Sequence, residues 1–179
     1  SLRNLPDVLS EIQRRLGADD AWLDVRFPYF VRKQAPVSKA ESLMSYDCAF
    51  HAAKRGPDFD FTLEVTVPVK SLCPCSKAVS EYGAHNQRSL VTVSVAGEAF
   101  LWIEDVVEVV EASASSPLYA LLKRDDEKYV TEHAYDHPRF VEDLVREVMG
   151  RMQALEGVRK VTVTADNQES IHNHSAYAT

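Results

Sequence analysis

The sequence of 179 residues predicts an α+β protein with an antiparallel sheet and its helices on one face. Two observations lead to this expectation. Several segments alternate apolar with polar residues, as half-buried strands do, and others repeat apolar residues at helical spacing. The order of these segments is α, β, β in the first third of the chain and β, β, α, α, β, β in the rest. We therefore expect two similar modules in tandem, the first lacking its opening elements.

Residues 1–57 are assigned to the remainder of the first module. A short amphipathic helix is expected over residues 4–16, where apolar residues recur at helical spacing. Two strands follow, because residues 22–31 and 42–53 carry aromatic and apolar side chains at alternate positions. The first of these strands is expected to be interrupted at Pro28.

Residues 58–179 are assigned to the second, complete module. The clearest alternation in the chain begins at Phe59, where six apolar residues share one face as far as Val69. The longest apolar stripe at helical spacing begins near Pro138. The elements expected are strands over 59–69 and 91–95, helices over 102–110 and 138–155, and strands over 158–165 and from 174 onward.

The composition is that of an ordinary globular protein, with 45% hydrophobic and 26% charged residues. The formal net charge of −7 gives no overall attraction to nucleic acid or to an anionic membrane. No stretch approaches the roughly 18 apolar residues of a membrane span, and the chain does not start like a secretory signal. We therefore expect a cytoplasmic protein without nucleic-acid or membrane partners.

A cluster of potential metal ligands follows the predicted strand over 59–69. Cys73 and Cys75 flank a proline, and His85 comes ten residues later. Thiolates and an imidazole are typical ligands of zinc or iron. A Cys-x-Cys pair alone is a weak signal, because two buried structural cysteines would look the same. The spacing also leaves open which of the two cysteines would supply the thiolate.

Two other clusters contain polar residues of functional interest. Glu169, His172 and His174 put a carboxylate and two imidazoles within six residues, although solvated polar sequence would look the same. Residues 121–128 are rich in both charges. They predict either a charged surface loop or a site that offers basic groups to phosphate and a carboxylate to a metal.

Glu142 lies in the first turns of the predicted helix over 138–155. A carboxylate there interacts favourably with the helix dipole, which is one sufficient reason for its presence. It can also accept two parallel hydrogen bonds from an N–H pair, which is the pattern that the edge of guanine displays.

Five motifs in the same order along nearly the whole chain resemble those of type IB GTP cyclohydrolases. The motifs are Ser71–Lys77, Tyr82–Ser89, Leu122–Arg124 with Asp126–Glu132, Phe140–Asp143, and Glu169–Tyr177. The resemblance implies a bimodular tunnel fold, in which each module has two strands, two helices and two strands. It further implies a homo-oligomer, expected to be a tetramer, whose sheets close into tunnels and whose active sites lie between subunits.

The reaction implied by the resemblance converts GTP and water to formate and 7,8-dihydroneopterin triphosphate, the first step toward tetrahydrofolate-type pterins. The resemblance also implies one divalent metal ion in each site. Its expected ligands are Cys73, His85 and Glu127, with a fourth position open. Zinc, iron and manganese are all compatible with this donor set.

The remaining motif residues are assigned to substrate binding and proton transfer. Glu142 is expected to recognise guanine, and Glu169 and His172 to transfer protons. Cys75 is expected either to donate a proton or to hydrogen-bond the metal ligands. The cations expected to bind the triphosphate are Lys77, Arg88, Lys123 and Arg124.

Three alternatives remain compatible with the sequence. An archaeal-type GTP cyclohydrolase would give a cyclic phosphate product. A tunnel-fold nitrile reductase would use NADPH and a cysteine nucleophile without a catalytic metal. A non-catalytic module would bind a metal or a guanine nucleotide without turnover.

Overall fold

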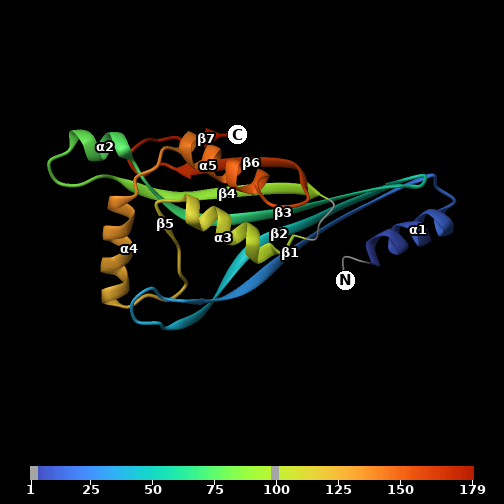
Figure 1. The fold of residues 1–179 in the computed structure, drawn as a ribbon, viewed down its shortest axis with the longest axis horizontal. Coiled ribbons are helices and arrows are strands. Elements are labelled where there is room, and N and C mark those ends of the chain that lie inside the picture. Colours follow the sequence, from blue (N-terminus) through green and yellow to red (C-terminus); the bar gives the residue numbers. More distant parts are fainter. Residues whose placement is uncertain (1–3, 98–100) are drawn as a thin grey trace.

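The computed structural model describes residues 4–97 and 101–179, which contain five helices and seven strands (Figure 1). The helices are α1 (Leu5–Leu16), α2 (Pro74–Val79), α3 (Ile103–Ser113), α4 (Arg124–Asp136) and α5 (Val141–Gln153). The strands are β1 (Asp20–Gln34), β2 (Glu41–Arg55), β3 (Asp58–Leu72), β4 (Asn86–Gly97), β5 (Ser116–Pro117), β6 (Val158–Gln168) and β7 (Ala176–Ala178). Among these residues, no helix combines the length and the apolarity of a membrane span.

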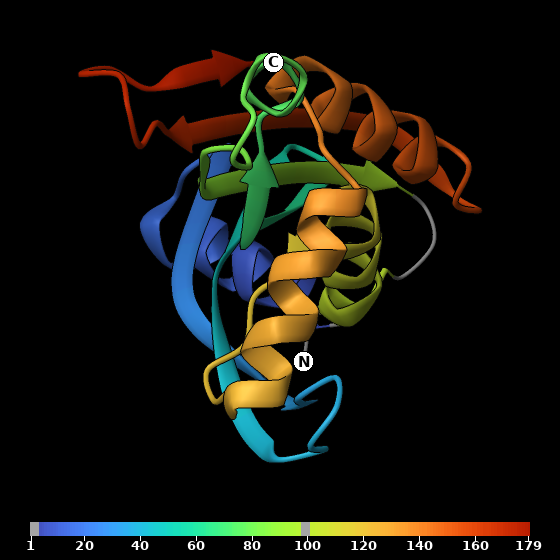
Figure 2. The ribbon, with the colours of Figure 1, turned by 90° about the vertical axis from the view of Figure 1, so that its left-hand side faces the viewer.

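The strands form one antiparallel sheet in the order β1-β2-β3-β4-β6-β7, with β5 paired to β3. The fold is therefore α+β, as the alternation in the sequence predicts. The β1–β2 hairpin pairs with β3 only as far as Asp47 and Thr66. Beyond that pair the hairpin diverges from β3, and α4 lies across the end of the molecule between the hairpin turn and α2 (Figures 1 and 2).

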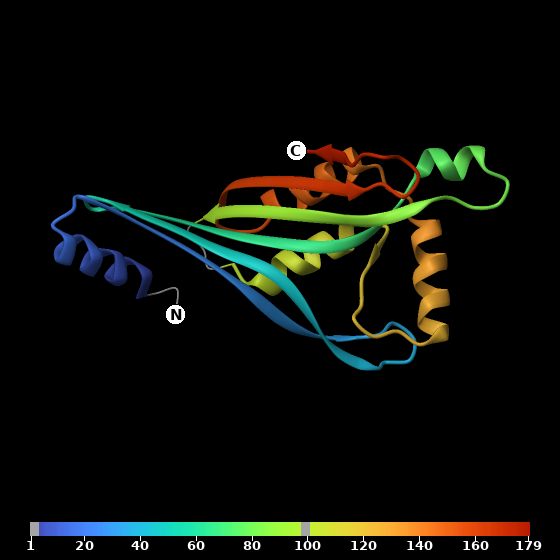
Figure 3. The ribbon, with the colours of Figure 1, turned by 180° about the vertical axis from the view of Figure 1, so that it is seen from behind.

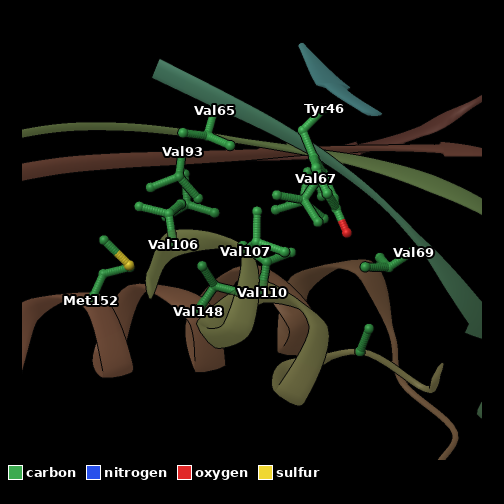
Figure 4. Packing of buried hydrophobic residues seen from close by; sticks show 14 of the residues in the cluster. Tyr46, Val65, Val67, Val69, Val93, Val106, Val107, Val110, Val148 and Met152 are labelled. Atoms are coloured by element: carbon green, nitrogen blue, oxygen red, sulfur yellow. The ribbon is translucent and has the colours of Figure 1, made fainter. Parts of the chain in front are cut away.

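The core lies between the sheet and the helices on one of its faces. Val65 and Val67 of β3 and Val93 of β4 have no exposed surface and point toward α3 and α5 (Figure 4). The helices contribute fully buried Val106, Val110, Leu144, Val148 and Met152. Fully burying such a side chain contributes about 1.5–3 kcal/mol, so these contacts are sufficient to hold both helices on the sheet.

Helix α1 packs on the same face of the sheet, at the end of the β1–β2 hairpin that lies opposite its turn (Figure 3). Its Leu9 forms a second cluster with Ala21 of β1 and Ala52 of β2. Ala52 is opposite Phe61 in the β2–β3 register, and Phe61 lies two residues before Leu63 of the main core. Since side chains two residues apart share a face, α1, α3 and α5 all cover the same side of the sheet.

The structure confirms most of the predicted elements and moves some boundaries. Strand β1 continues through Pro28, because it is the edge strand, where a residue without an N–H group is tolerated. Helix α5 begins at Val141 and not at Pro138. The N–H of Arg139 donates to the carbonyl of Leu72 at 3.1 Å, so the residues before α5 run extended against the end of β3.

Within the charged segment over residues 121–128, residues 121–123 are not helical, and α4 begins at Arg124. Asp126 accounts for this helix start. Its buried carboxylate accepts hydrogen bonds from the N–H of Lys123 at 2.9 Å, the N–H groups of Val37 and Ser38 at 2.8 Å each, and the hydroxyl of Ser38 at 2.6 Å. One side chain thus caps α4 and ties it to the β1–β2 turn.

The predicted boundary between residues 57 and 58 falls in the turn between β2 and β3. These two strands pair with each other, so both predicted modules contribute to a single sheet. The second part also contains α2, β5 and α4 in addition to the six elements expected. The division into two modules remains a prediction.

Candidate active site

The apolar face of the sheet becomes polar toward one end. In the strand register, Val67, Val91 and Ala165 form an apolar row across β3, β4 and β6. The next row contains Ser89 and Asn167, and the one after it pairs Ser71 with Gln87. All four polar residues are buried. The core therefore ends in buried hydrogen-bonding groups just before the chain reaches Cys73.

Cys73 and His85 meet at this end of the sheet. The N–H of Cys73 donates to the carbonyl of His85 at 3.1 Å, which extends the β3–β4 pairing by one step. The Cys73 sulfur also caps α2, because it accepts the N–H of Ser76 at 3.4 Å, and Pro74 occupies the first turn. Cys73 is partly buried, whereas Cys75 is exposed on α2.

Glu169 joins His85 from the end of β6. The Nδ1 atom of His85 lies 3.0 Å from Oε1 of Gln87 and 3.9 Å from Oε2 of Glu169. The Nε2 group of Gln87 donates to Oε1 of Glu169 at 3.4 Å, and the hydroxyl of Ser170 lies 3.5 Å from the same imidazole nitrogen. Only 13% of the His85 side chain and 10% of the Glu169 side chain are exposed. The fold thus places the imidazole of His85 beside the carboxylate of Glu169, and the backbone pairing puts Cys73 opposite His85 at the same end of the sheet.

Glu142 lies at the start of α5, near this cluster. The hydrogen bond from Arg139 to Leu72 holds the start of α5 beside the residue that precedes Cys73, and Glu142 is exposed in the first turn of that helix. The Nε group of Arg139 is buried and has no hydrogen-bond partner among the described residues. The start of α5 therefore carries a carboxylate that can accept two N–H groups. It also carries the Nε–H donor of Arg139, which has no hydrogen-bond partner among the described residues.

Glu127, the third predicted metal ligand, lies elsewhere in the chain. It is in the first turn of α4, where Arg124 forms an ion pair with it at 3.2 Å, and Lys123 precedes it. Tyr135, at the end of α4 that contacts α2, lies about 12 Å from Glu127 along the helix axis. Among the described residues, no group of three or more His, Cys, Asp and Glu side chains is arranged to hold a metal ion. A single chain thus unites Cys73 with His85 but not with Glu127.

The other predicted site residues are spread over several elements. Lys77 on α2 donates to the carbonyl of Tyr135 at 2.5 Å, with its ammonium 4.1 Å from the centre of that ring. Arg88 is exposed in β4 one residue after Gln87, so it points to the opposite face of the sheet. His172 and His174 are exposed between β6 and β7, with their rings stacked 5.3 Å apart.

A pocket of about 560 Å³ lies where the β1–β2 hairpin diverges from β3. Its lining includes basic Lys33 and Arg139, His133 and His137, and the acidic residues Glu104, Glu108 and Glu111 of α3. Lys33 and Glu111 form a partly buried ion pair at 2.5 Å. Burial lowers the pKa of the Lys33 ammonium, and the adjacent Glu111 carboxylate opposes this effect. The pocket is therefore lined by groups of both charges.

Two buried residues near these groups are not among the candidates that the sequence motifs suggest. Gln87 continues the face of Val91 and Val93, so its place on the core side follows from the strand period. A buried polar residue there is a signal in its own right. Asp126 was grouped with its charged neighbours, although an acid three residues after Lys123 fits a helix start.

Comparison with known proteins agrees with the family resemblance of the sequence motifs. A family model described as type I GTP cyclohydrolase folE2 matches residues 1–178. The chain is 56% identical over 178 residues to the GTP cyclohydrolase FolE2 of Citrifermentans bemidjiense, a match that covers 99% of this chain and 66% of that protein. For the FolE2 of Geotalea uraniireducens and of Nitrosococcus oceani the identities are 54% and 53%, again over 99% of this chain, with 65% and 67% of the relatives covered. The chain thus spans about two thirds of the length of the curated relatives it matches.

Proposed function

Because the chain belongs to the type I GTP cyclohydrolase family described as folE2, we propose that the protein containing it converts GTP and water to formate and 7,8-dihydroneopterin triphosphate. The observation that carries this proposal is the cluster of Cys73, His85 and Glu169, from three strand ends, on the buried end of the core face. A low-exposure cluster of a thiol, an imidazole and a carboxylate suits metal binding and proton transfer.

We further propose that Cys73, His85 and Glu127 hold one divalent metal ion. The donor chemistry of the first two fits, since a thiolate and an imidazole nitrogen favour zinc and are compatible with iron or manganese. When bound, such an ion would lower the pKa of a coordinated water to about 7, so that hydroxide is available near neutral pH. The identity of the ion, and the choice between Cys73 and Cys75 as the thiolate, are left to the experiments below.

The separation of Glu127 from Cys73 within one chain favours a site shared between subunits. Glu127 is exposed at the N-terminal end of α4, where it is accessible to a neighbouring protomer. A homo-oligomer, expected to be a tetramer with tunnel-forming sheets, would supply such a neighbour. In that assembly, Glu127 of one subunit would complete the ligand set begun by Cys73 and His85 of another.

The other residues of the cluster fit the steps that follow from this reaction. Glu142 would accept the N–H pair of guanine from its place in the first turn of α5. Glu169 and His172 would hold and move protons at the purine and the ribose, and Cys75 is a candidate proton donor. The proposed triphosphate ligands are Lys77, Arg88, Lys123 and Arg124.

The full-length protein, loaded separately with zinc, iron(II) or manganese(II), should release one formate for each GTP consumed. Pterin fluorescence and mass spectrometry would identify the product. A cyclic phosphate would indicate the archaeal-type reaction instead. Consumption of NADPH would indicate a nitrile reductase, and GTP binding without turnover a binding module.

The ligand assignment has its own test. Cys73→Ala and His85→Ala should lose both bound metal and formate release, whereas His51→Ala, which removes an imidazole from β2, should retain both. Cys75→Ser should keep its bound metal if Cys73 is the ligand and lose it if Cys75 is the ligand. Full metal occupancy in Cys73→Ala would exclude that cysteine.

Subunit sharing is tested by complementation. Cys73→Ala and Glu127→Ala are each expected to be inactive alone. If each site takes its ligands from two chains, co-expression of the two variants should restore about one quarter of the wild-type activity, because both ligands are then intact in that fraction of sites. If all three ligands come from one chain, co-expression restores nothing.

A further inference from the structure

Gln87 is the only side chain of the described residues that hydrogen-bonds both His85 and Glu169. It lies in β4 on the core face, and only 9% of its surface is exposed. Its amide has an oxygen 3.0 Å from Nδ1 of His85 and a nitrogen 3.4 Å from Oε1 of Glu169. The amide therefore lies between the imidazole and the carboxylate.

The chemistry of these groups fixes the direction of both hydrogen bonds. The NH₂ group of Gln87 donates to Glu169. The carbonyl oxygen of the same amide then points to His85, and a carbonyl oxygen can only accept. The Nδ1 atom of a neutral His85 must therefore carry the proton, which leaves the lone pair on Nε2.

We propose that Gln87 is a positioning residue that holds His85 in the tautomer whose Nε2 binds the metal ion. The same amide holds Glu169 beside the imidazole. This inference rests on the metal site proposed above, but the tautomer itself is a property of the metal-free protein. Ligating histidines commonly need such a partner, and its loss typically weakens metal binding 10–100-fold.

Two substitutions separate the hydrogen bond from the volume of the side chain. Gln87→Leu removes both hydrogen bonds. Gln87→Glu keeps an oxygen that can accept the proton of His85, and a proton shared between the new carboxyl group and Glu169 can take the place of the lost N–H. We expect the dissociation constant of the metal, measured by chelator competition on the full-length protein, to rise 10–100-fold in Gln87→Leu and to stay within about threefold of wild type in Gln87→Glu.

A matched control and a second measurement exclude a general loss of structure. Gln168→Leu changes an exposed glutamine at the end of β6 and should leave the metal affinity unchanged. In metal-free protein labelled with ¹⁵N-histidine, NMR should report Nδ1–H for His85 in the wild type and in Gln87→Glu, and a mixture of tautomers in Gln87→Leu. The inference is overturned if Gln87→Leu keeps wild-type affinity and a pure Nδ1–H tautomer, or if both variants lose metal equally. A wild-type protein that binds no metal refutes the proposed metal site, while the NMR result still tests the role of Gln87.

Discussion

Gly97→Ala should destabilise the protein because the space beside Gly97 is already filled by backbone. Gly97 is the last residue of β4 and lies opposite Val158 at a register shift between β4 and β6. A Cβ atom there would lie 2.2 Å from the carbonyl oxygen of Gly157, and contacts under 3.0 Å essentially never occur. The oxygen would have to move by roughly 0.8 Å or more, in a turn where Gly157 has a φ of 78°.

Forcing extra atoms into a packed region costs about 1–3 kcal/mol, and each kcal/mol lowers the melting temperature of a protein this size by about 2–4 °C. We therefore expect Gly97→Ala to melt roughly 2–12 °C below wild type, followed by far-ultraviolet circular dichroism at fixed protein concentration.

The matched control is Gly150→Ala. Gly150 is exposed within α5, and a Cβ atom there would meet nothing within 4 Å. Alanine favours a helix over glycine by about 0.5–1 kcal/mol, so this variant should melt slightly higher than wild type. The close approach of β4 to the Gly157 turn is wrong if Gly97→Ala has the melting temperature of wild type. It is also wrong if the melting temperature of Gly97→Ala rises, as that of Gly150→Ala is expected to do.

Three further predictions follow from buried groups. Leu144→Ala, at a position of α5 with no exposed surface, should cost about 2–5 kcal/mol in urea unfolding, whereas Leu43→Ala, 60% exposed in β2, should change stability little. Burial alone would raise the pKa of the Asp126 carboxyl, but hydrogen bonds from Ser38, Val37 and Lys123 hold it below its ordinary 3.8. The difference in free energy of unfolding between wild type and Asp126→Asn should therefore be largest above about pH 4 and decrease as the pH falls below that value. A difference that does not change with pH would contradict this role of Asp126. Burial also raises the pKa of the Cys48 thiol to about 11, so iodoacetamide at pH 8 should label exposed Cys75 first and Cys48 only in urea, as peptide mass spectrometry would detect.

The strands of the core were predictable because their pattern is set by the sheet itself. The alternation from Phe59 to Val69 is strict, and the same period places Val91 and Val93 on the buried side of β4. Such a pattern needs no knowledge of distant contacts, since one face of a strand is buried and the other is not.

Helix α4 could not be found in the same way. Its fully or largely buried residues are only Asp126, Val130 and Ala134, because it lies across the end of the sheet and not over its face. The helix starts where it does because Asp126 reaches Val37 and Ser38, almost 90 positions away in the sequence. Contacts of that separation leave no local periodic signal.

The sequence suggests which residues form the candidate site, and that assignment stays a prediction; it does not give the geometry of those residues. The motifs identify Cys73, His85 and Glu127 equally well, yet only the first two share a strand end in the folded chain. Motif order carries no distances, so the position of Glu127 at the remote end of α4 became visible only in the structure. The strand period places Gln87 on the core face, but no motif assigns a role to a single amide, so its contacts with His85 and Glu169 became visible only in the structure.

Under the metal site proposed above, the anchoring of α4 by the tip of the β1–β2 hairpin links the length of the hairpin to the position of a metal ligand. Val37 and Ser38 bind Asp126, the residue before Glu127, so the hairpin acts as a spacer that sets where this glutamate is presented. Removing one residue from each strand would shorten the spacer by about 3.3 Å and invert the faces of the side chains beyond the deletion. Variation in hairpin length is therefore expected to be tolerated much less here than in an ordinary surface hairpin, even though the tip lies far from Cys73 along the chain.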